Sequence, residues 1–162
     1  DGAGVFSAVT QKILDKYLGL DDFDWIETYA KRLNQRGNKA DEVVAKIWTT
    51  VEKANTSIIN INNYAGIYKD PWFGKIEIYK KGEDLWFRSL RSPKLTGRMH
   101  YYGANTFVAK WPDSGLTDAD AFVMFNLDEN GIAQGFKMKG ISPAIDFSFD
   151  FQDLDLKRMH DE

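Results

Sequence analysis

Residues 75–90 read KIEIYKKGEDLWFRSL, and this stretch decides the fold. Apolar and polar side chains alternate on both sides of a turn, Lys81-Gly82-Glu83-Asp84, and a period of two residues is typical of strands with one buried face. A connection this short joins antiparallel neighbours. The stretch therefore predicts a hairpin with strands at 75–80 and 85–90.

The same alternation begins near residue 58 and continues almost to the end of the chain. It predicts further strands near residues 58–68, 94–102, 106–111, 121–128, 133–140 and 145–157. Turn-forming residues such as Ser92-Pro93 and Asp128-Glu-Asn-Gly131 separate them. Roughly eight antiparallel strands in a meander close most economically into an up-and-down β-barrel, because closure removes exposed edges.

The last predicted strand has the clearest alternation. Ile145, Phe147, Phe149 and Phe151 fall on one face, and Asp146, Ser148, Asp150 and Gln152 fall on the other. The apolar phase then shifts by one residue, to Leu154 and Leu156. Because such a slip turns every side chain to the other face, we predict a β-bulge near Gln152-Asp153.

The first third of the chain has a helical period instead. An apolar stripe recurs every fourth residue from Val5 to Tyr17, and Gly19 provides a C-terminal stop. A second helix is predicted from Asp24, which forms a capping-box-like pattern with the glutamate three residues later, to Gly37. A third helix is predicted from Asp41 to about Asn55.

These patterns predict an α+β, mainly β, chain with two parts. A helical segment at residues 1–57 precedes an antiparallel, roughly eight-stranded up-and-down β-barrel domain at residues 58–162. The opening Asp1-Gly-Ala-Gly-Val-Phe reads as the interior of a longer protein. The apolar stripe of the first helix is broad, so we expect it to be covered, by a neighbouring domain or by a second copy in a homodimer.

Composition narrows the classes of partner. The formal net charge is −3, and Lys and Arg are scattered, which argues against a nucleic-acid surface. The chain has no cysteine, so disulfides and thiolate metal sites are excluded. No apolar stretch approaches the roughly 18 residues that cross a bilayer. We therefore predict no nucleic-acid partner and no membrane span.

The sequence contains no catalytic motif. No serine is followed at the third position by lysine, and neither Lys-Thr-Gly nor Gly-x-Ser-x-Gly occurs. Two histidines, His100 and His160, are too few for a three-histidine zinc site. A triad assembled from scattered residues is the alternative. We predict a chain that is not an enzyme, with no catalytic residue, no metal ligand and no cofactor.

Four acidic residues near the C-terminus allow two interpretations. Asp146, Asp150, Asp153 and Asp155 have the oxygen ligands of a calcium site or the carboxylates of a catalytic pair. The alternative is the solvated face of the last strand, which we favour.

Aromatic and basic residues give the functional hint. Trp86 and Arg88 share a face of one predicted strand, Arg98, His100 and Tyr102 share a face of the next, and further tryptophans lie near strand ends. Such rings can line the mouth of a barrel and stack on a ligand, with arginine pairing a carboxylate. The alternative is a barrel filled by its own side chains. The predicted ligand-binding residues are Trp72, Trp86, Arg88, Arg98, His100, Tyr102 and Trp111.

Six motifs in order resemble one known family. They are Tyr64-Ala-Gly-Ile-Tyr68, Pro71-Trp-Phe-Gly74, Leu85-Trp-Phe87, Ser92-Pro-Lys-Leu95, Thr106-Phe-Val-Ala-Lys-Trp111 and Asp146-Phe-Ser-Phe-Asp-Phe-Gln-Asp-Leu154. Together they resemble the lipocalin-like C-terminal domain of unknown function that is appended to bacterial β-lactamase-related (class C and penicillin-binding-protein-like) serine hydrolases.

The resemblance implies a function without catalysis. The chain would be an accessory domain that positions or shields the substrate cleft of an N-terminal serine hydrolase domain in the same parent protein, in a periplasmic or extracellular setting. The alternative is a free-standing lipocalin-like binder of a small apolar or peptide-like ligand.

Overall fold

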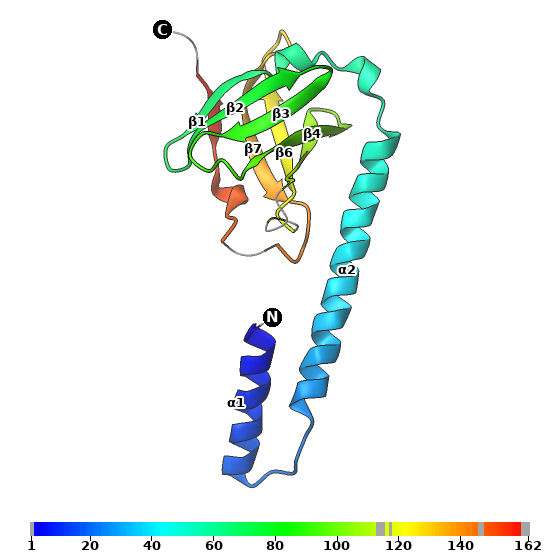
Figure 1. Cartoon of the computed structure of the whole chain (residues 1–162), viewed down its shortest axis with the longest axis vertical. Helices are drawn as coiled ribbons and strands as arrows, with labels where there is room; N and C mark the ends of the chain where they lie inside the picture. Colours follow the sequence, from blue (N-terminus) through cyan, green and yellow to red (C-terminus); the bar gives the residue numbers. More distant parts are fainter. Residues whose placement is uncertain (1, 113–115, 117, 146–147, 160–162) are drawn as a thin grey trace. The chain divides into compact units, whose positions relative to one another are not determined.

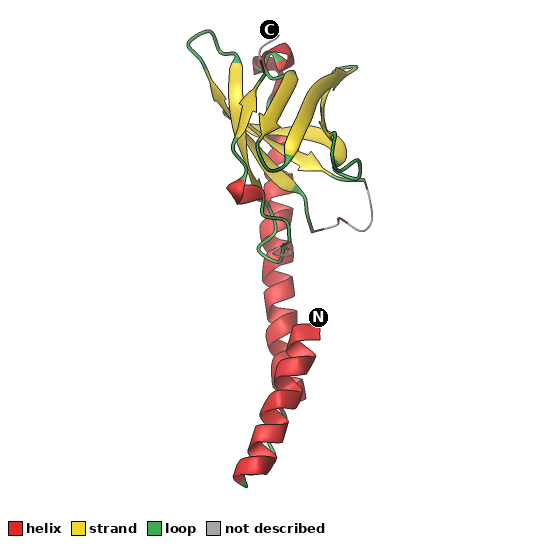
Figure 2. Cartoon of the chain, turned by 90° about the vertical axis from the view of Figure 1, so that its left-hand side faces the viewer, coloured by secondary structure: helices red, strands yellow, loops and turns green. Residues whose placement is uncertain are grey.

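A computed structural model describes residues 2–112, 116, 118–145 and 148–159. The chain divides into two compact units, Asp1–Glu42 and Val43–Glu162. Figures 1 and 2 show the helices and the strands of the barrel.

Two helices occupy the first part of the chain, α1 (Gly2–Leu18) and α2 (Trp25–Lys53). The predicted stop of the first helix is confirmed: Gly19 has φ 67°, and the N–H of Leu20 donates to the carbonyl of Asp15 at 2.9 Å. This is the hydrogen bond of a Schellman cap. The predicted cap of the second helix is confirmed as well, since Asp24 Oδ1 accepts from the N–H of Glu27 at 2.8 Å.

The prediction that Gly37 ends a helix is wrong. α2 runs through this residue, and the second and third predicted helices are one. Gly37 does not have the positive φ of a C-terminal cap, and its backbone is that of an ordinary helical residue. A glycine inside a helix costs only about 1 kcal/mol, and the apolar stripe continues on both sides of it.

The first unit is a helical hairpin with a narrow seam and an exposed apolar face. Gly4 and Ala8 are buried, and a side chain added at Gly4 would meet Leu33. Trp25 Nε1 donates to Asp15 Oδ2 at 2.5 Å across the hairpin. The large apolar side chains that stay exposed are Val5, Phe6, Val9, Ile13, Leu14, Tyr17, Leu18, Leu20, Phe23 and Ile26.

The second unit contains eight strands in chain order. They are β1 (Gly66–Asp70), β2 (Gly74–Lys81), β3 (Asp84–Ser89), β4 (Thr96–Gly103), β5 (Thr106–Lys110), β6 (Ala121–Leu127), β7 (Ala133–Gly140) and β8 (Leu156–Arg158). Each strand pairs antiparallel with the next, and β8 pairs with β1. The predicted closed up-and-down barrel is therefore confirmed.

The long first strand predicted at 58–68 is wrong in its first half. Residues 56–63 contain two short 3₁₀ helices, η1 (Thr56–Ile58) and η2 (Ile61–Asn63), and β1 begins at Gly66. Asn60 explains part of the change, because its side chain accepts from the N–H of Asn62 at 3.1 Å and caps η2. Side chains of this type compete with strand hydrogen bonding.

The last strand also differs from the prediction. Within the predicted range 145–157, the described residues include a 3₁₀ helix, η4 (Phe151–Asp153), and strand structure only from Leu156. Phe151 and Leu154 are both buried, as a period of three residues allows. The phase shift is therefore absorbed by a 3₁₀ turn and not by a β-bulge. Asp146 and Phe147, and His160 beyond β8, lie outside the described residues.

Side chains pack the interior of the barrel into one hydrophobic core. Tyr64 contacts Phe107 and Phe125 edge-on with ring centroids 5.0 Å apart, and Phe136 lies 5.1 Å from Phe125. Aliphatic residues such as Ile76 complete a single core. An eight-stranded barrel is narrow enough to be packed in this way.

Arg158 ties the short closing strand to the rest of the barrel. Its Nε donates to the carbonyl of Ala133, and its Nη2 donates to the carbonyl of Asn63 at 3.1 Å and to Tyr68 Oη at 3.0 Å. Tyr68 Oη in turn donates to the carbonyl of Tyr64 at 2.7 Å. Burial raises the pKa of Tyr68 to about 12, against the lowering effect of Arg158, so the phenol keeps its proton.

Candidate functional site

An open cleft is lined by residues of the segment that contains η1 and η2. This segment lies at one end of the barrel, and η4 lies at the other (Figures 1 and 2). The wall opens at the cleft because β3 begins at Asp84 while β4 continues to Gly103. The pair Leu85–Met99 is the last that joins these two strands. The register of β4 against β5 also shifts between Tyr101 and Gly103, which marks a bulge. The cleft has a volume of about 640 Å³, within the range of ligand sites.

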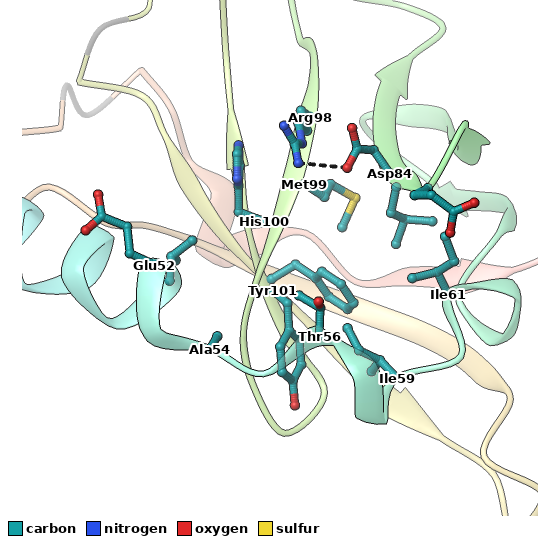
Figure 3. Close-up of a pocket in the computed structure, with 14 residues that line it drawn as sticks. Glu52, Ala54, Thr56, Ile59, Ile61, Asp84, Arg98, Met99, His100 and Tyr101 are labelled. Atoms are coloured by element: carbon teal, nitrogen blue, oxygen red, sulfur yellow. Dashed lines mark ion pairs between the residues drawn. The ribbon is translucent and has the colours of Figure 1, made fainter.

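The floor of the cleft is apolar. Met99, Tyr101 and Phe107 point inward from their strands and are buried members of the barrel core. Ile59 and Ile61, from the 3₁₀ segment, form a second apolar wall (Figure 3). The floor therefore offers an apolar ligand a surface continuous with the core.

Charged side chains surround this floor. Arg98 Nη2 pairs with Asp84 Oδ1 at 2.7 Å, and Figure 3 shows this pair and His100 above the cleft. Glu52, from the last turn of α2, lies on another side of the cleft, and Glu83 comes from the β2–β3 turn. The rim thus contains three carboxylates and one guanidinium.

His100 is neutral at physiological pH. Burial lowers its pKa, and the positive charges of Arg98 and Lys110 lower it further, whereas Asp84 acts in the opposite direction. Its ring meets Trp48 of α2 edge-on, with centroids 5.2 Å apart, and Lys110 Nζ lies 4.9 Å from the Trp48 ring. These contacts join the last turns of α2 to the outer face of β4 and β5.

Of the seven predicted ligand-binding residues, the cleft brings together only Arg98 and His100. Trp86, Arg88 and Tyr102 lie on the outer face of the sheet, because the residues that alternate with them point into the core. Arg88 pairs with Glu77 on β2. The ring of Tyr102 meets that of Phe122, with centroids 5.1 Å apart.

Trp86 has an unusual environment on this outer face. Lys81 Nζ lies 4.7 Å from the centre of its ring. Its Nε1 is buried without a hydrogen-bond partner among the described residues. Arg98 faces it directly across the β3–β4 pair, so Trp86 lies beside the cleft but does not line it.

The two remaining tryptophans lie in different places. Trp72 is 65% exposed in the β1–β2 turn, where it lines a small apolar pocket of about 180 Å³ with Phe149 and Leu154. Trp111 is buried in the core, and its Nε1 donates to the carbonyl of Ala119 at 2.6 Å. The first is a surface residue and the second a structural one.

Asp70 holds the turn that carries Trp72. Its Oδ1 accepts from the N–H groups of Trp72 and Phe73, both at 2.8 Å, and its Oδ2 accepts from the N–H of Asp155 at 3.0 Å. Burial acts to raise the pKa of Asp70, but these three donors together lower it. The ionised carboxylate therefore fixes two loops at once.

Sequence reasoning missed most of the cleft. The sequence placed Glu52 in the third predicted helix and Glu83 in the turn at residues 81–84. It placed Ile59 and Ile61 in the strand predicted near residues 58–68. The available signal was the asparagine-rich segment 55–63, whose side chains favour local hydrogen bonds over a regular strand. Because the segment does not join the sheet, its apolar residues Ile59 and Ile61 can pack against the core at one end of the barrel.

The part of the chain that the structure describes contains no cluster of metal-binding side chains. His, Asp and Glu side chains do not gather there in a group of three or more that could hold a metal ion. Asp150, Asp153 and Asp155 are exposed, and Asp155 lies 3.5 Å from Lys137. None of the described helices combines the length and the hydropathy needed to cross a bilayer.

Fold and site together define a class: a filled, closed eight-stranded antiparallel barrel with helices before it and a cleft at one end. Residues 52–158 match the family model described as "Domain of unknown function (DUF3471)", so the chain belongs to that family. No curated protein matches the chain. The predicted boundary at residues 57 and 58 stays a prediction, although the family match begins a few residues before it.

Proposed function

We propose that this chain is a non-catalytic accessory domain of a bacterial β-lactamase-related serine hydrolase, in a periplasmic or extracellular setting. The observation that carries the proposal is the exposed apolar face of the helical unit. Phe6 is 74% exposed and Tyr17 is 88% exposed, and eight further large apolar residues of the hairpin accompany them. Large apolar residues exposed in such number typically mark a surface for another protein.

Two features of the barrel support the same proposal. The interior is packed with aromatic rings, for example Phe125 and Phe136 with centroids 5.1 Å apart. The histidine that the structure describes, His100, packs its ring edge-on against Trp48, with centroids 5.2 Å apart. The partner is the hydrolase domain that the sequence resemblance implies, and its substrates are peptides or peptidoglycan-like amides.

The direct test begins with the coding sequence that precedes Asp1 in the genome. We expect it to encode a domain with Ser-x-x-Lys, and that domain should show a different kcat/KM toward peptide substrates with and without residues 1–162. The double variant Phe6→Glu, Tyr17→Glu should remove the difference. Leu90→Glu, which changes an exposed apolar residue of the barrel unit, is the matched control and should preserve it.

Two results would contradict the proposal. One is a preceding region without a hydrolase domain. The other is covalent labelling of this chain by a fluorescent penicillin, which would show a reactive serine of its own.

A second candidate is a free-standing binder of a small ligand, with the helical face used for a homodimer. The observation that favours it is the open cleft with its apolar floor. Light scattering of the chain mixed with the hydrolase domain separates the two. Replacement of the self-associated chain by a complex with the hydrolase domain would favour the accessory role, and a dimer that persists in the mixture would favour the free-standing protein.

A further inference from the structure

The cleft has the volume and the apolar floor of a ligand site, and its rim has an excess of negative charge. Asp84 and Arg98 neutralise each other at 2.7 Å. Glu52 and Glu83 are exposed and have no ion pair in the described part of the chain. Two carboxylates are therefore left for a ligand.

The end of α2 adds to this negative potential. The helix is 29 residues long and ends at Lys53, so its last carbonyl groups lie in the segment that lines the cleft. The C-terminal end of a helix has a partial negative charge that favours cations. Lys53 itself is not among the lining residues.

The neighbouring cations do not cancel this charge. His100 is held neutral by its burial and by the positive charges beside it. Lys110 lies over the Trp48 ring on the outer face of the barrel, and Lys81 lies over Trp86. Among the described residues, Arg98 is the one cationic side chain that lines the cleft, and it is paired with Asp84.

We propose that this cleft binds an organic cation that carries an apolar group. The apolar part packs on Tyr101, Ile59 and Ile61, and the ammonium or guanidinium group pairs with Glu52 or Glu83 at the rim. A basic, aromatic or aliphatic peptide end has this chemistry. The inference does not depend on the function of the helical unit, because every residue that it uses belongs to the second unit.

Three probes of one shape test the charge preference. Phenethylamine, phenethyl alcohol and hydrocinnamate present the same phenylethyl group with a positive, a neutral and a negative end. Each is titrated into the ¹⁵N-labelled full chain while the amide chemical shifts of residues 52–61 and 98–101 are followed. We expect saturable shifts, with the amine bound about threefold to tenfold more tightly than the alcohol and the acid bound weakest.

Variants then assign the effect to the two carboxylates. The double variant Glu52→Gln, Glu83→Gln should lower the affinity for the amine to that for the alcohol and leave the alcohol unchanged. Glu129→Gln, at an exposed turn between β6 and β7, is the control and should change neither affinity. Arg98→Gln should tighten amine binding, because it releases the Asp84 carboxylate.

The floor is tested separately by Ile59→Ala, which should weaken the amine and the alcohol by the same factor. Three results would overturn the proposal: no saturable shift with phenethylamine up to its solubility limit, equal affinity for the amine and the alcohol, or shifts confined to residues outside the cleft. None of these results would affect the proposed accessory function, which is tested on the helical unit and on hydrolase activity.

Discussion

The barrel and the helical hairpin differ in the burial of their large apolar side chains. In the barrel, large residues such as Phe87, Phe107 and Phe136 are almost completely buried and belong to one core. In the hairpin, the buried seam consists of small residues, and large ones such as Phe6 and Tyr17 are exposed. Burial of apolar surface within the barrel therefore stabilises it without a partner. The hairpin leaves apolar surface in water, and binding a partner there would remove that surface from water.

The largest expected effect comes from the barrel core. Phe136→Ala removes a ring that lies 4.9 Å from Tyr68 and 5.1 Å from Phe125, and it should lower the free energy of unfolding by about 3–5 kcal/mol. Phe6→Ala, the same change on the hairpin, should alter it by less than about 0.5 kcal/mol at low protein concentration. Urea denaturation followed by tryptophan fluorescence measures both. Equal losses would contradict the comparison.

Closure of the barrel is the next feature to test. Arg158→Met removes the donors to Ala133, Asn63 and Tyr68, and it should cost about 2–3 kcal/mol because β8 pairs with β1 over only two residues. Lys157→Met, on the exposed neighbour, should cost less than about 0.5 kcal/mol. A loss for Arg158→Met no larger than for its control would show that the barrel closes without this residue.

Two buried carboxylates should respond to amidation with opposite signs. Asp70→Asn should lower stability by about 1–3 kcal/mol, because the amide presents a donor where the N–H of Asp155 also donates. The lowered pKa of Asp70 means that its contribution is present above the unfolded-state pKa of about 3.9 and is lost as the pH falls through its folded-state value.

Asp120 is the opposite case. Burial raises its pKa, with a further contribution from Asp118, against the N–H of Trp111 and the charge of Lys110. The ionised form is therefore disfavoured in the folded state, and the penalty disappears as the pH falls through the raised pKa. Asp120→Asn should be more stable than the wild type at pH 7, and the difference should vanish in acid. Urea titrations across pH follow both variants, and the same sign for both would contradict this account.

The smallest expected effect concerns the hairpin face. We predict concentration-dependent self-association of the isolated chain through exposed residues such as Phe6 and Tyr17. The double variant Phe6→Glu, Tyr17→Glu should stay monomeric in light scattering, and Leu90→Glu should associate like the wild type. A wild-type chain that remains monomeric at high concentration would leave the hydrolase domain as the partner.

The strands that were predicted correctly are those in which apolar and polar residues alternate and the apolar ones are buried in the core. Ile76 and Ile78 alternate with Glu77 and Tyr79, and the structure buries the first pair completely. The failures share a physical cause. At Asn60 and at Phe151, local hydrogen bonds of a 3₁₀ turn replace the ladder that the alternation suggested.

The candidate site was harder to predict than the fold. The sequence placed Arg98 and His100 on one face of a strand. The cleft itself depends on two further features: β4 extends beyond its last pair with β3, and Glu52 at the end of α2 lines the same cleft. Neither fact is local in sequence. Trp111, another of the predicted ligand-binding residues, is buried, and its Nε1 donates to the carbonyl of Ala119.

Native-state hydrogen exchange tests the contrast between the two units most directly. At low protein concentration, amides of the paired strands, for example in β2 and β6, should exchange only through openings close to the full free energy of unfolding. Amides of residues 5–18 should exchange through openings of much lower free energy and become slower when the hairpin face is occupied. Equal protection of α1 and of the barrel strands in the dilute, unpartnered chain would contradict the account.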